Sequence, residues 1–360
     1  MNQVIMWIVA AGVVLGGIDR LLGNRWGYGE QFEKGFELLG PTAFSMAGIL
    51  CLSGLLSGGL SEGAKSFFAG IGLDPSMFGG LIAIDMGGYH LARALALDPQ
   101  VGLYAGLVPA ATLGCSLVFT IPVGSNLLEK KDLKFLCLGM AIGMMTLPVC
   151  LILGGLLFGL SLGTVLLQNL FLFAFALLCG IGLWRFPEPM LKVFRVFTYI
   201  LKVILTVGLV LGAVKQLTGA QFLPGLMPLP EAMEVVCSVC VFLLGSLPVA
   251  LLLQRVLKKP LGAVGKLIGV NETSMAALLI GFVSAMPVFA MAKDMDPKGK
   301  LLNLSFIFCS TAVFGAHLGF TSSVAPDYLG ALIVAKLAGA LAAAIVAVLS
   351  ANKILKPKGE

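Results

Sequence analysis

An acidic residue, Asp85, lies inside an apolar segment long enough to enter a membrane, and Gly87 and Gly88 follow it. A carboxylate in the bilayer interior is costly, so it usually faces a cavity and has a partner. A solute with an ammonium group would supply that partner through a charge-assisted hydrogen bond, and the glycines would let the solute approach the backbone. The segment therefore predicts a binding site for a small cation. The structural alternatives are that Asp85 caps its own half-helix or pairs with Lys202 or Lys336, and that the glycines only break the helix.

Four further positions could contribute to the same site. Ser284 and Pro287 interrupt a second apolar segment, where the Ser284 hydroxyl and a carbonyl left without a donor by Pro287 could face a pore. Kinking of the helix is the alternative explanation for Pro287. His317, in the next apolar segment, could bind solute, relay protons or hydrogen-bond a neighbouring helix. Thr120 occupies the position of Thr321 in an internal repeat, and it completes the predicted set.

Other kinds of chemistry have less support. An intramembrane hydrolase needs two carboxylates at similar depth, whereas Asp19 lies at the membrane interface, where an ion pair involving Asp19 and Arg20 is expected. Cys237 and Cys240 form one CxxC without a second pair, which predicts two small apolar residues one helical turn apart. We therefore expect no enzymatic activity, no cofactor and no bound metal.

Composition indicates a membrane protein. The chain has 360 residues, of which 58% are hydrophobic and 12% are charged, whereas a soluble domain carries about 25% charged residues. Several apolar runs exceed the roughly 20 residues that span a bilayer. The net charge of +6 comes from Lys and Arg in short loops, so it does not indicate binding to nucleic acid.

The chain contains eleven apolar segments, but the distribution of positive charge argues against eleven crossings. If all eleven crossed, Lys and Arg would divide evenly between the two sides, contrary to the positive-inside rule. Two segments, 76–95 and 274–292, are interrupted near their middle, and each half is about nine residues, or about 14 Å, long. If both segments are re-entrant hairpins, nineteen of the 24 Lys and Arg residues are cytoplasmic and three are outside. The expected crossings are residues 3–22, 38–58, 101–124, 133–158, 163–184, 197–216, 233–254, 301–323 and 328–350.

The sequence also repeats itself. Residues 12–23 match residues 208–219 at six of twelve positions, with an offset of 196. Residues 76–98 align with 274–296 at an offset of 198, and residues 114–123 align with 315–324 at 201. With nine crossings, the first repeat begins outside and the second begins inside, so the repeats are inverted.

These patterns together predict an all-α polytopic membrane protein with nine full crossings and two re-entrant helical hairpins. Residues 1–162 form the first inverted repeat with hairpin 76–95, residues 163–185 form a linking transmembrane helix, and residues 186–360 form the second repeat with hairpin 274–292. The N-terminus is expected outside and the C-terminus in the cytoplasm. Inverted repeats with broken helices are typical of secondary transporters, whose solute sites lie near the bilayer midplane.

Short motifs along the whole chain resemble the ethanolamine-utilisation transporter family of bacteria. The motifs lie at residues 18–21, 31–36, 74–78, 85–88, 119–123, 222–225, 260–267, 295–300 and 317–320. This chain has Ser284 and Ala285 at the second hairpin tip, where the family often carries Asn. The resemblance implies import of ethanolamine, a protonated amino alcohol, across the bacterial inner membrane as a source of carbon and nitrogen.

Two other functions are compatible with the residues themselves. One is transport of another small metabolite, such as a nucleoside or a different amine, and the other is a passive channel. The expected partners are ethanolamine and the lipid bilayer, with no nucleic acid, and a homo-oligomer is an open alternative.

Overall fold

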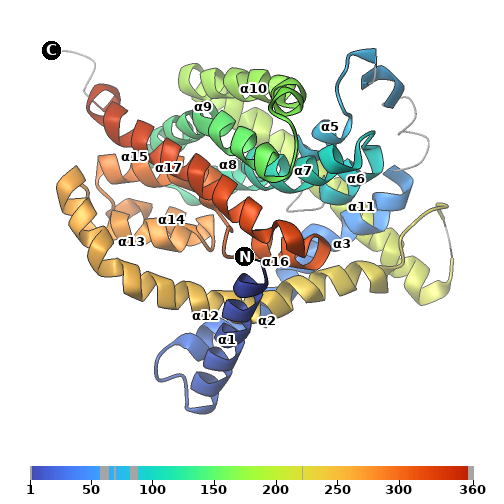
Figure 1. The fold of residues 1–360 in the computed structure, drawn as a ribbon, viewed down its shortest axis with the longest axis horizontal. Coiled ribbons are helices and arrows are strands. Elements are labelled where there is room, and N and C mark those ends of the chain that lie inside the picture. Colours follow the sequence, from blue (N-terminus) through green and yellow to red (C-terminus); the bar gives the residue numbers. More distant parts are fainter. Residues whose placement is uncertain (1, 57–64, 69, 82–87, 221, 356–360) are drawn as a thin grey trace.

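The computed structural model describes residues 2–56, 65–68, 70–81, 88–220 and 222–355, and its secondary-structure elements are helices (Figure 1). Within these ranges, eight helical segments are long and apolar enough to cross a membrane. They are Asn2–Leu21 (α1), Tyr28–Ser53 (α2 and α3), Pro99–Leu127 (α7 to α8), Lys130–Leu157 (η3 and α9), Leu162–Arg185 (α10), Pro187–Thr218 (α11), Leu229–Ile268 (α12) and Pro326–Ile354 (η5 and α17). The chain is therefore a multi-pass α-helical membrane protein.

The eight segments match eight of the nine expected crossings, and the ninth differs. The expected crossing 301–323 consists of two helices, α15 (Pro297–Ser310) and α16 (Ala316–Val324), separated by an interruption at 311–315. Ala312 has a φ of 56° there, a left-handed conformation that an α-helix cannot contain.

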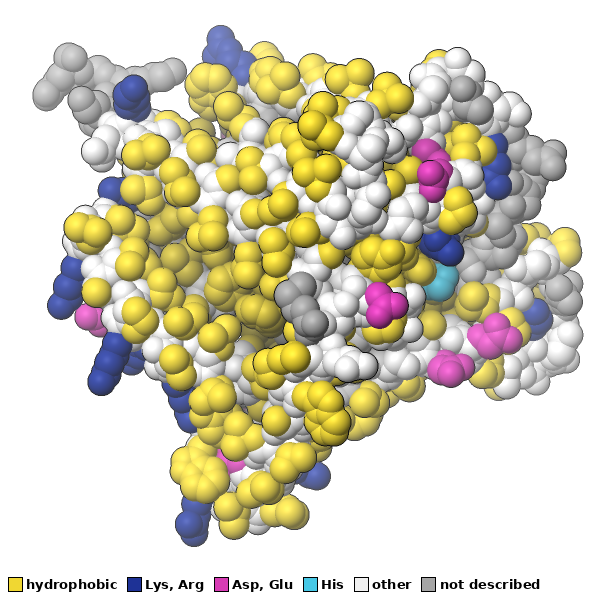
Figure 2. All heavy atoms as spheres, viewed as in Figure 1, with side chains coloured by type: hydrophobic (Ala, Val, Ile, Leu, Met, Phe, Trp, Pro, Cys, Tyr) yellow, Lys and Arg dark blue, Asp and Glu magenta, His cyan; other side chains and the backbone are white. Residues whose placement is uncertain are grey.

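Burial separates the central helices from the peripheral ones. In Pro99–Leu127, 89% of the most apolar stretch is buried inside the protein, compared with 22% for both α1 and α11. The central segment is therefore enclosed by other helices, while α1 and α11 present apolar side chains outward. Hydrophobic side chains cover much of the face shown in Figure 2, as expected for a surface in contact with lipid.

Helix α12 (Leu229–Ile268) runs along the width of the molecule in Figure 1. Its 40 residues correspond to about 60 Å, twice the thickness of the hydrocarbon core. Pro260 lies inside this helix, and residues 261–268 continue α12 beyond it. Lys258 and Lys259 lie just before Pro260 and Lys266 lies after it, and Figure 2 shows Lys and Arg side chains gathered along the corresponding edge.

Two pairs of short helices interrupt the series of long ones. The first pair is α5 (Ser76–Leu81) and α6 (Gly88–Leu95). A Cβ atom on Gly79 would lie 2.7 Å from the backbone nitrogen of Ala92, so the two helices pack with their backbones in close contact. At the base of the pair, the Asp74 carboxylate accepts hydrogen bonds from the N–H groups of Leu97 (3.0 Å) and Asp98 (2.8 Å). The chain thus enters and leaves this pair at the same point.

The second pair, α13 (Glu272–Gly281) and α14 (Ala285–Met291), is closed in a similar way. The Asp296 carboxylate accepts a hydrogen bond from the Asn271 N–H at 2.9 Å, and the Asn271 side chain donates to the Asp294 carbonyl at 2.9 Å. In both pairs, the acidic residue after the second helix also caps the next long helix: Asp98 caps α7 (Pro99–Pro109) and Asp296 caps α15, each with Pro at the first helical position.

Glycines allow two equivalent helix crossings. A Cβ on Gly12 of α1 would lie 2.3 Å from the carbonyl oxygen of Gly245 in α12, and a Cβ on Gly208 of α11 would lie 2.2 Å from that of Gly48 in α3 (Leu39–Leu56). Both crossings therefore need glycine, because small residues let two membrane helices approach closely. Gly12 and Gly208 are the positions that correspond in the aligned sequences.

A buried ion pair fastens the loop before α9 (Leu133–Leu157) to α15. The Lys300 ammonium lies 2.6 Å from the carboxylate of Asp132, which ends η3 (Lys130–Asp132), and both side chains are at least nine-tenths buried. Removing one partner of such a pair is strongly destabilising, because it leaves the other charge buried and unpaired.

The glycine crossings lead to a prediction about stability. Gly12→Ala should lower the free energy of unfolding by about 1–3 kcal/mol, because the new methyl group overlaps the Gly245 carbonyl and the helices must separate. Gly17→Ala in the same helix is the matched control, since a Cβ there meets nothing within 4 Å. Thermal unfolding in detergent measures both variants, and equal midpoints would contradict the close crossing.

Candidate functional site

The described residues include five of the seven predicted site residues. Asp85 and Gly87 lie outside the described ranges, so the role of Asp85 stays a prediction. Gly88 is the first residue of α6 and is buried. Its neighbour Tyr89 packs its ring against Phe320 of α16, with ring centroids 5.5 Å apart. The start of α6 therefore contacts α16, the helix that carries His317.

Ser284 and Pro287 lie at the turn between α13 and α14. Ser284 is the N-cap of α14, and its hydroxyl accepts a hydrogen bond from the Met286 N–H at 3.3 Å. Pro287 is the third residue of α14 and is exposed. A proline in the first turn breaks no bond within the helix, because the first four N–H groups have no intrahelical partner. Helix capping is thus the contribution of Ser284 that the geometry displays.

The turn of the second pair contacts the interruption between α15 and α16. The Phe314 N–H donates to the Phe282 carbonyl at 2.9 Å. A Cβ on Gly315 would lie 2.6 Å from the Val283 carbonyl oxygen, so the two backbones touch. The interruption is therefore supported by α13 and α14 on one side, while α16 contacts α6 on the other.

The corresponding part of the first repeat is irregular too. After α7, two π-helical segments follow, η1 (Ala110–Gly114) and η2 (Ser116–Thr120), before α8 (Ile121–Leu127). The Cys115 N–H bonds to the carbonyl of Ala110, five residues back. Wide turns of this kind are rare and occur frequently at functional sites.

Two polar residues lie within η2, the predicted site residue Thr120 and Ser116. Thr120 is fully buried, and its hydroxyl has no hydrogen-bond partner among the described residues. Ser116, which aligns with His317, donates to the carbonyl of Phe308 in α15 at 3.1 Å. The irregular segment of the first repeat is thus bonded to the second repeat.

Lys336 in α17 (Leu329–Ile354) joins the two irregular segments. Its ammonium nitrogen lies 2.5 Å from the Ala111 carbonyl oxygen in η1 and 2.9 Å from Nδ1 of His317 at the start of α16. Lys336 and His317 are both fully buried. His317 and the π-helical segment η1 therefore belong to one site, which we call the junction and define as Ala111, His317 and Lys336.

Lys336 is the member of the junction whose role the sequence did not indicate. The sequence offered a signal, because a lysine inside a long apolar run is expensive and is a candidate functional residue by default. Its partner Ala111 offered no signal, since a backbone carbonyl in a π-helical segment leaves no trace in composition.

The ion pair expected around Asp19 and Arg20 forms differently. Arg20 pairs with Glu33, with Nε and Oε1 2.8 Å apart. The buried Asp19 carboxylate accepts hydrogen bonds from the N–H groups of Trp26 (3.0 Å) and Gly29 (2.9 Å), so it holds the turn after α1.

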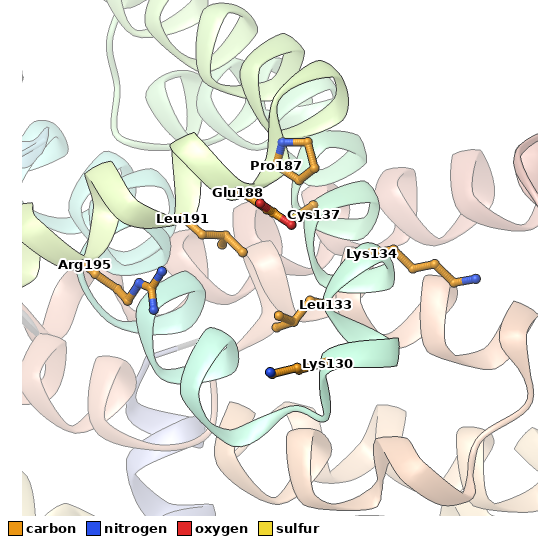
Figure 3. Close-up of a pocket in the computed structure, with 8 residues that line it drawn as sticks. All are labelled: Lys130, Leu133, Lys134, Cys137, Pro187, Glu188, Leu191 and Arg195. Atoms are coloured by element: carbon orange, nitrogen blue, oxygen red, sulfur yellow. The ribbon is translucent and has the colours of Figure 1, made fainter.

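Two cavities open elsewhere on the protein. One of about 510 Å³ lies between α9 and α11, and Figure 3 shows Lys130, Glu188 and Arg195 around it. The other, about 730 Å³, lies between the C-terminal half of α12 and α13. The five predicted site residues that the structure describes line neither cavity.

The whole chain is similar to known ethanolamine-utilisation proteins. Residues 1–350 match the family model described as "Ethanolamine utilisation protein, EutH". A protein of Listeria monocytogenes named "Probable ethanolamine permease EutH" is 38% identical over 99% of this chain and 95% of its own length. Proteins with the same name from Salmonella typhimurium and Escherichia coli are 33% and 32% identical, each over 98% of this chain and 96% of their own length.

An uncharacterised Bacillus subtilis protein, YxeR, is 35% identical over 96% of the chain and 94% of its own length. No solved structure matches the chain. The match of a family model to nearly the whole length, together with relatives above 30% identity that align from end to end, shows that this chain belongs to the EutH family of ethanolamine utilisation proteins.

Proposed function

We propose that the chain is a transporter, not an enzyme, and that it imports ethanolamine across the bacterial inner membrane for use as a source of carbon and nitrogen. The observation that carries the proposal is the junction, where acceptors from two irregular helices meet around a buried ammonium group. Broken helices of this kind bind solutes and ions in secondary transporters. The names of the relatives supply the substrate, which is itself an ammonium compound at neutral pH.

The same proposal assigns the ammonium-binding carboxylate to Asp85. An ammonium group has three N–H donors, so one bound ethanolammonium could share Asp85 with acceptors of the junction. Gly88 and Tyr89 support this assignment, because Tyr89 contacts Phe320, one helical turn from His317. Gly87, Ser284, Pro287 and Thr120 would shape the path around the substrate.

We also propose that the chain consists of two inverted repeats, 1–162 and 186–360, joined by a linking helix at 163–185. Support comes from the paired glycine crossings and from the two short helix pairs that precede α7 and α15. Each short helix has six to ten residues, or about 9–15 Å, too short for a 30 Å core. In this arrangement α5 with α6 enters the membrane from outside and α13 with α14 from the cytoplasm, where the C-terminus lies.

Labelling of single cysteines tests the re-entrant arrangement. Cysteines at Ile71 and Leu97, which flank the first pair, should both react with a membrane-impermeant maleimide from outside. Cysteines at Glu272 and Lys293, which flank the second pair, should both react from the cytoplasmic side. All four positions are exposed. If the two residues that flank either pair reacted from opposite sides, that pair would cross the membrane and the inverted-repeat proposal would be wrong.

Transport in proteoliposomes tests the function itself. Purified protein should accumulate labelled ethanolamine faster than protein-free vesicles, and unlabelled ethanolamine inside should accelerate its entry. A channel gives entry without this trans-stimulation, and competition by other amines or by nucleosides would identify a different substrate.

Asp85→Asn should abolish the specific uptake while the protein still inserts, because an amide cannot balance the substrate charge. Normal uptake by Asp85→Asn would remove Asp85 from the site.

A further inference from the structure

The junction contains a second ammonium group, that of Lys336, where the proposed substrate also needs to place one. We infer that the substrate ammonium and the proton on Lys336 exclude each other, so that transport exchanges one ethanolammonium for one proton. This inference depends on the proposed function. The inference adds two details to the proposed function: the coupled ion is a proton, and Lys336 carries it.

The acceptors of the junction suit an ammonium group. Lys336 directs two of its three N–H donors at the Ala111 carbonyl oxygen (2.5 Å) and Nδ1 of His317 (2.9 Å). His317 Nε2 is also buried and has no hydrogen-bond partner among the described residues. Because Nδ1 accepts from Lys336, Nε2 carries the ring proton, so it offers a donor for the substrate hydroxyl and not a further acceptor for an ammonium group.

The described groups around Lys336 carry no negative charge that would compensate a second cation, and the proposed Asp85 carboxylate balances one cation, not two. The titratable groups that face it are His317 from α16 and the thiols of Cys115, Cys150 and Cys309, which come from the η1–η2 connection, α9 and α15. Among the described residues, no carboxylate forms an ion pair with Lys336.

Other elements that pack on α17 contribute no further charge to this point. From α7, the Tyr104 hydroxyl bonds to Leu151 and Asn169. The start of α1 meets α17 at Gly330, six residues before Lys336, where the Asn2 side chain accepts the Gly330 N–H. Asp327, in η5 (Pro326–Tyr328), is exposed at the same end.

Repulsion between the two positive charges then leads to an exchange of the substrate ammonium for the proton on Lys336. Two unit positive charges that share acceptors in a low-dielectric interior repel strongly. When ethanolammonium enters, Lys336 therefore releases its proton to water on the open side and becomes a neutral amine. After the substrate leaves on the other side, Lys336 takes up a proton there. One positive charge moves in each direction, so the cycle is electrically neutral, and accumulation depends on a pH gradient or on consumption of the product inside.

Imposed gradients in proteoliposomes test the exchange. At pH 6, after subtraction of uptake by protein-free vesicles, the unmodified protein should take up ethanolamine when the interior is made acidic. A potassium diffusion potential, negative inside, should give no stimulation at equal pH.

Lys336→Gln removes the proton site but keeps polar donors, so its uptake should respond to the potential and lose its response to the pH gradient. Lys336→Arg keeps a permanent charge, and its uptake should be at least about tenfold lower, because the charge cannot leave.

A purely structural lysine would give a different result, since Arg would then replace it better than Gln. Uptake driven by the potential in the unmodified protein, or full transport by Lys336→Arg, would overturn the exchange while leaving ethanolamine transport intact. Absence of any specific uptake by the unmodified protein would overturn the exchange and the proposed function together. The gradient dependence of the unmodified protein decides the question even if neither variant folds.

Discussion

A buried ammonium group constrains the centre of this membrane protein more than any other described feature. Lys336 is fully buried in the apolar stretch 329–349 of α17, and its partners are a backbone carbonyl and a histidine nitrogen. Lipid offers no hydrogen-bond acceptor to such a group, so its partners must come from the protein. Both partners lie in irregular segments: Ala111 belongs to the π-helical segment η1, and His317 follows the interruption at 311–315.

The surrounding elements support these two irregular segments. The short pair α13 and α14 contacts the interruption through Phe314 and Gly315, and α6 contacts α16 through Tyr89 and Phe320. The longest helix, α12, packs on α1, α3 and α16. Irregular backbone at membrane depth is tolerated where protein encloses it, and the burial of Pro99–Leu127 meets that condition. In the proposed transport cycle, these irregular segments are the ones that rearrange when a solute replaces the Lys336 contacts.

Hydropathy alone was sufficient to predict most of the long helices, because each needs a run of apolar residues whatever surrounds it. Side-chain caps fix the starts of two helices, since Asp98 caps α7 and Asn271 caps α13. The π-turns and the Lys336 contacts were not predictable, since they depend on residues up to 225 positions apart. The expected crossing 233–254 ends where the polar residues begin, at Gln254, whereas α12 continues through Pro260 to Ile268. Within the junction, the sequence predicted a role for His317 but not its contact with Lys336.

A double-mutant cycle on the junction tests its central contact most directly. Thermal unfolding midpoints in detergent would be compared for the unmodified protein, Lys336→Met, His317→Phe and the double variant. If Lys336 and His317 hold the two irregular segments together, each single variant leaves a buried polar partner unsatisfied, and the double variant should be no less stable than the weaker single one, with a coupling energy of about 1–3 kcal/mol. Strictly additive losses of stability would show that the two side chains do not interact, and would contradict the account.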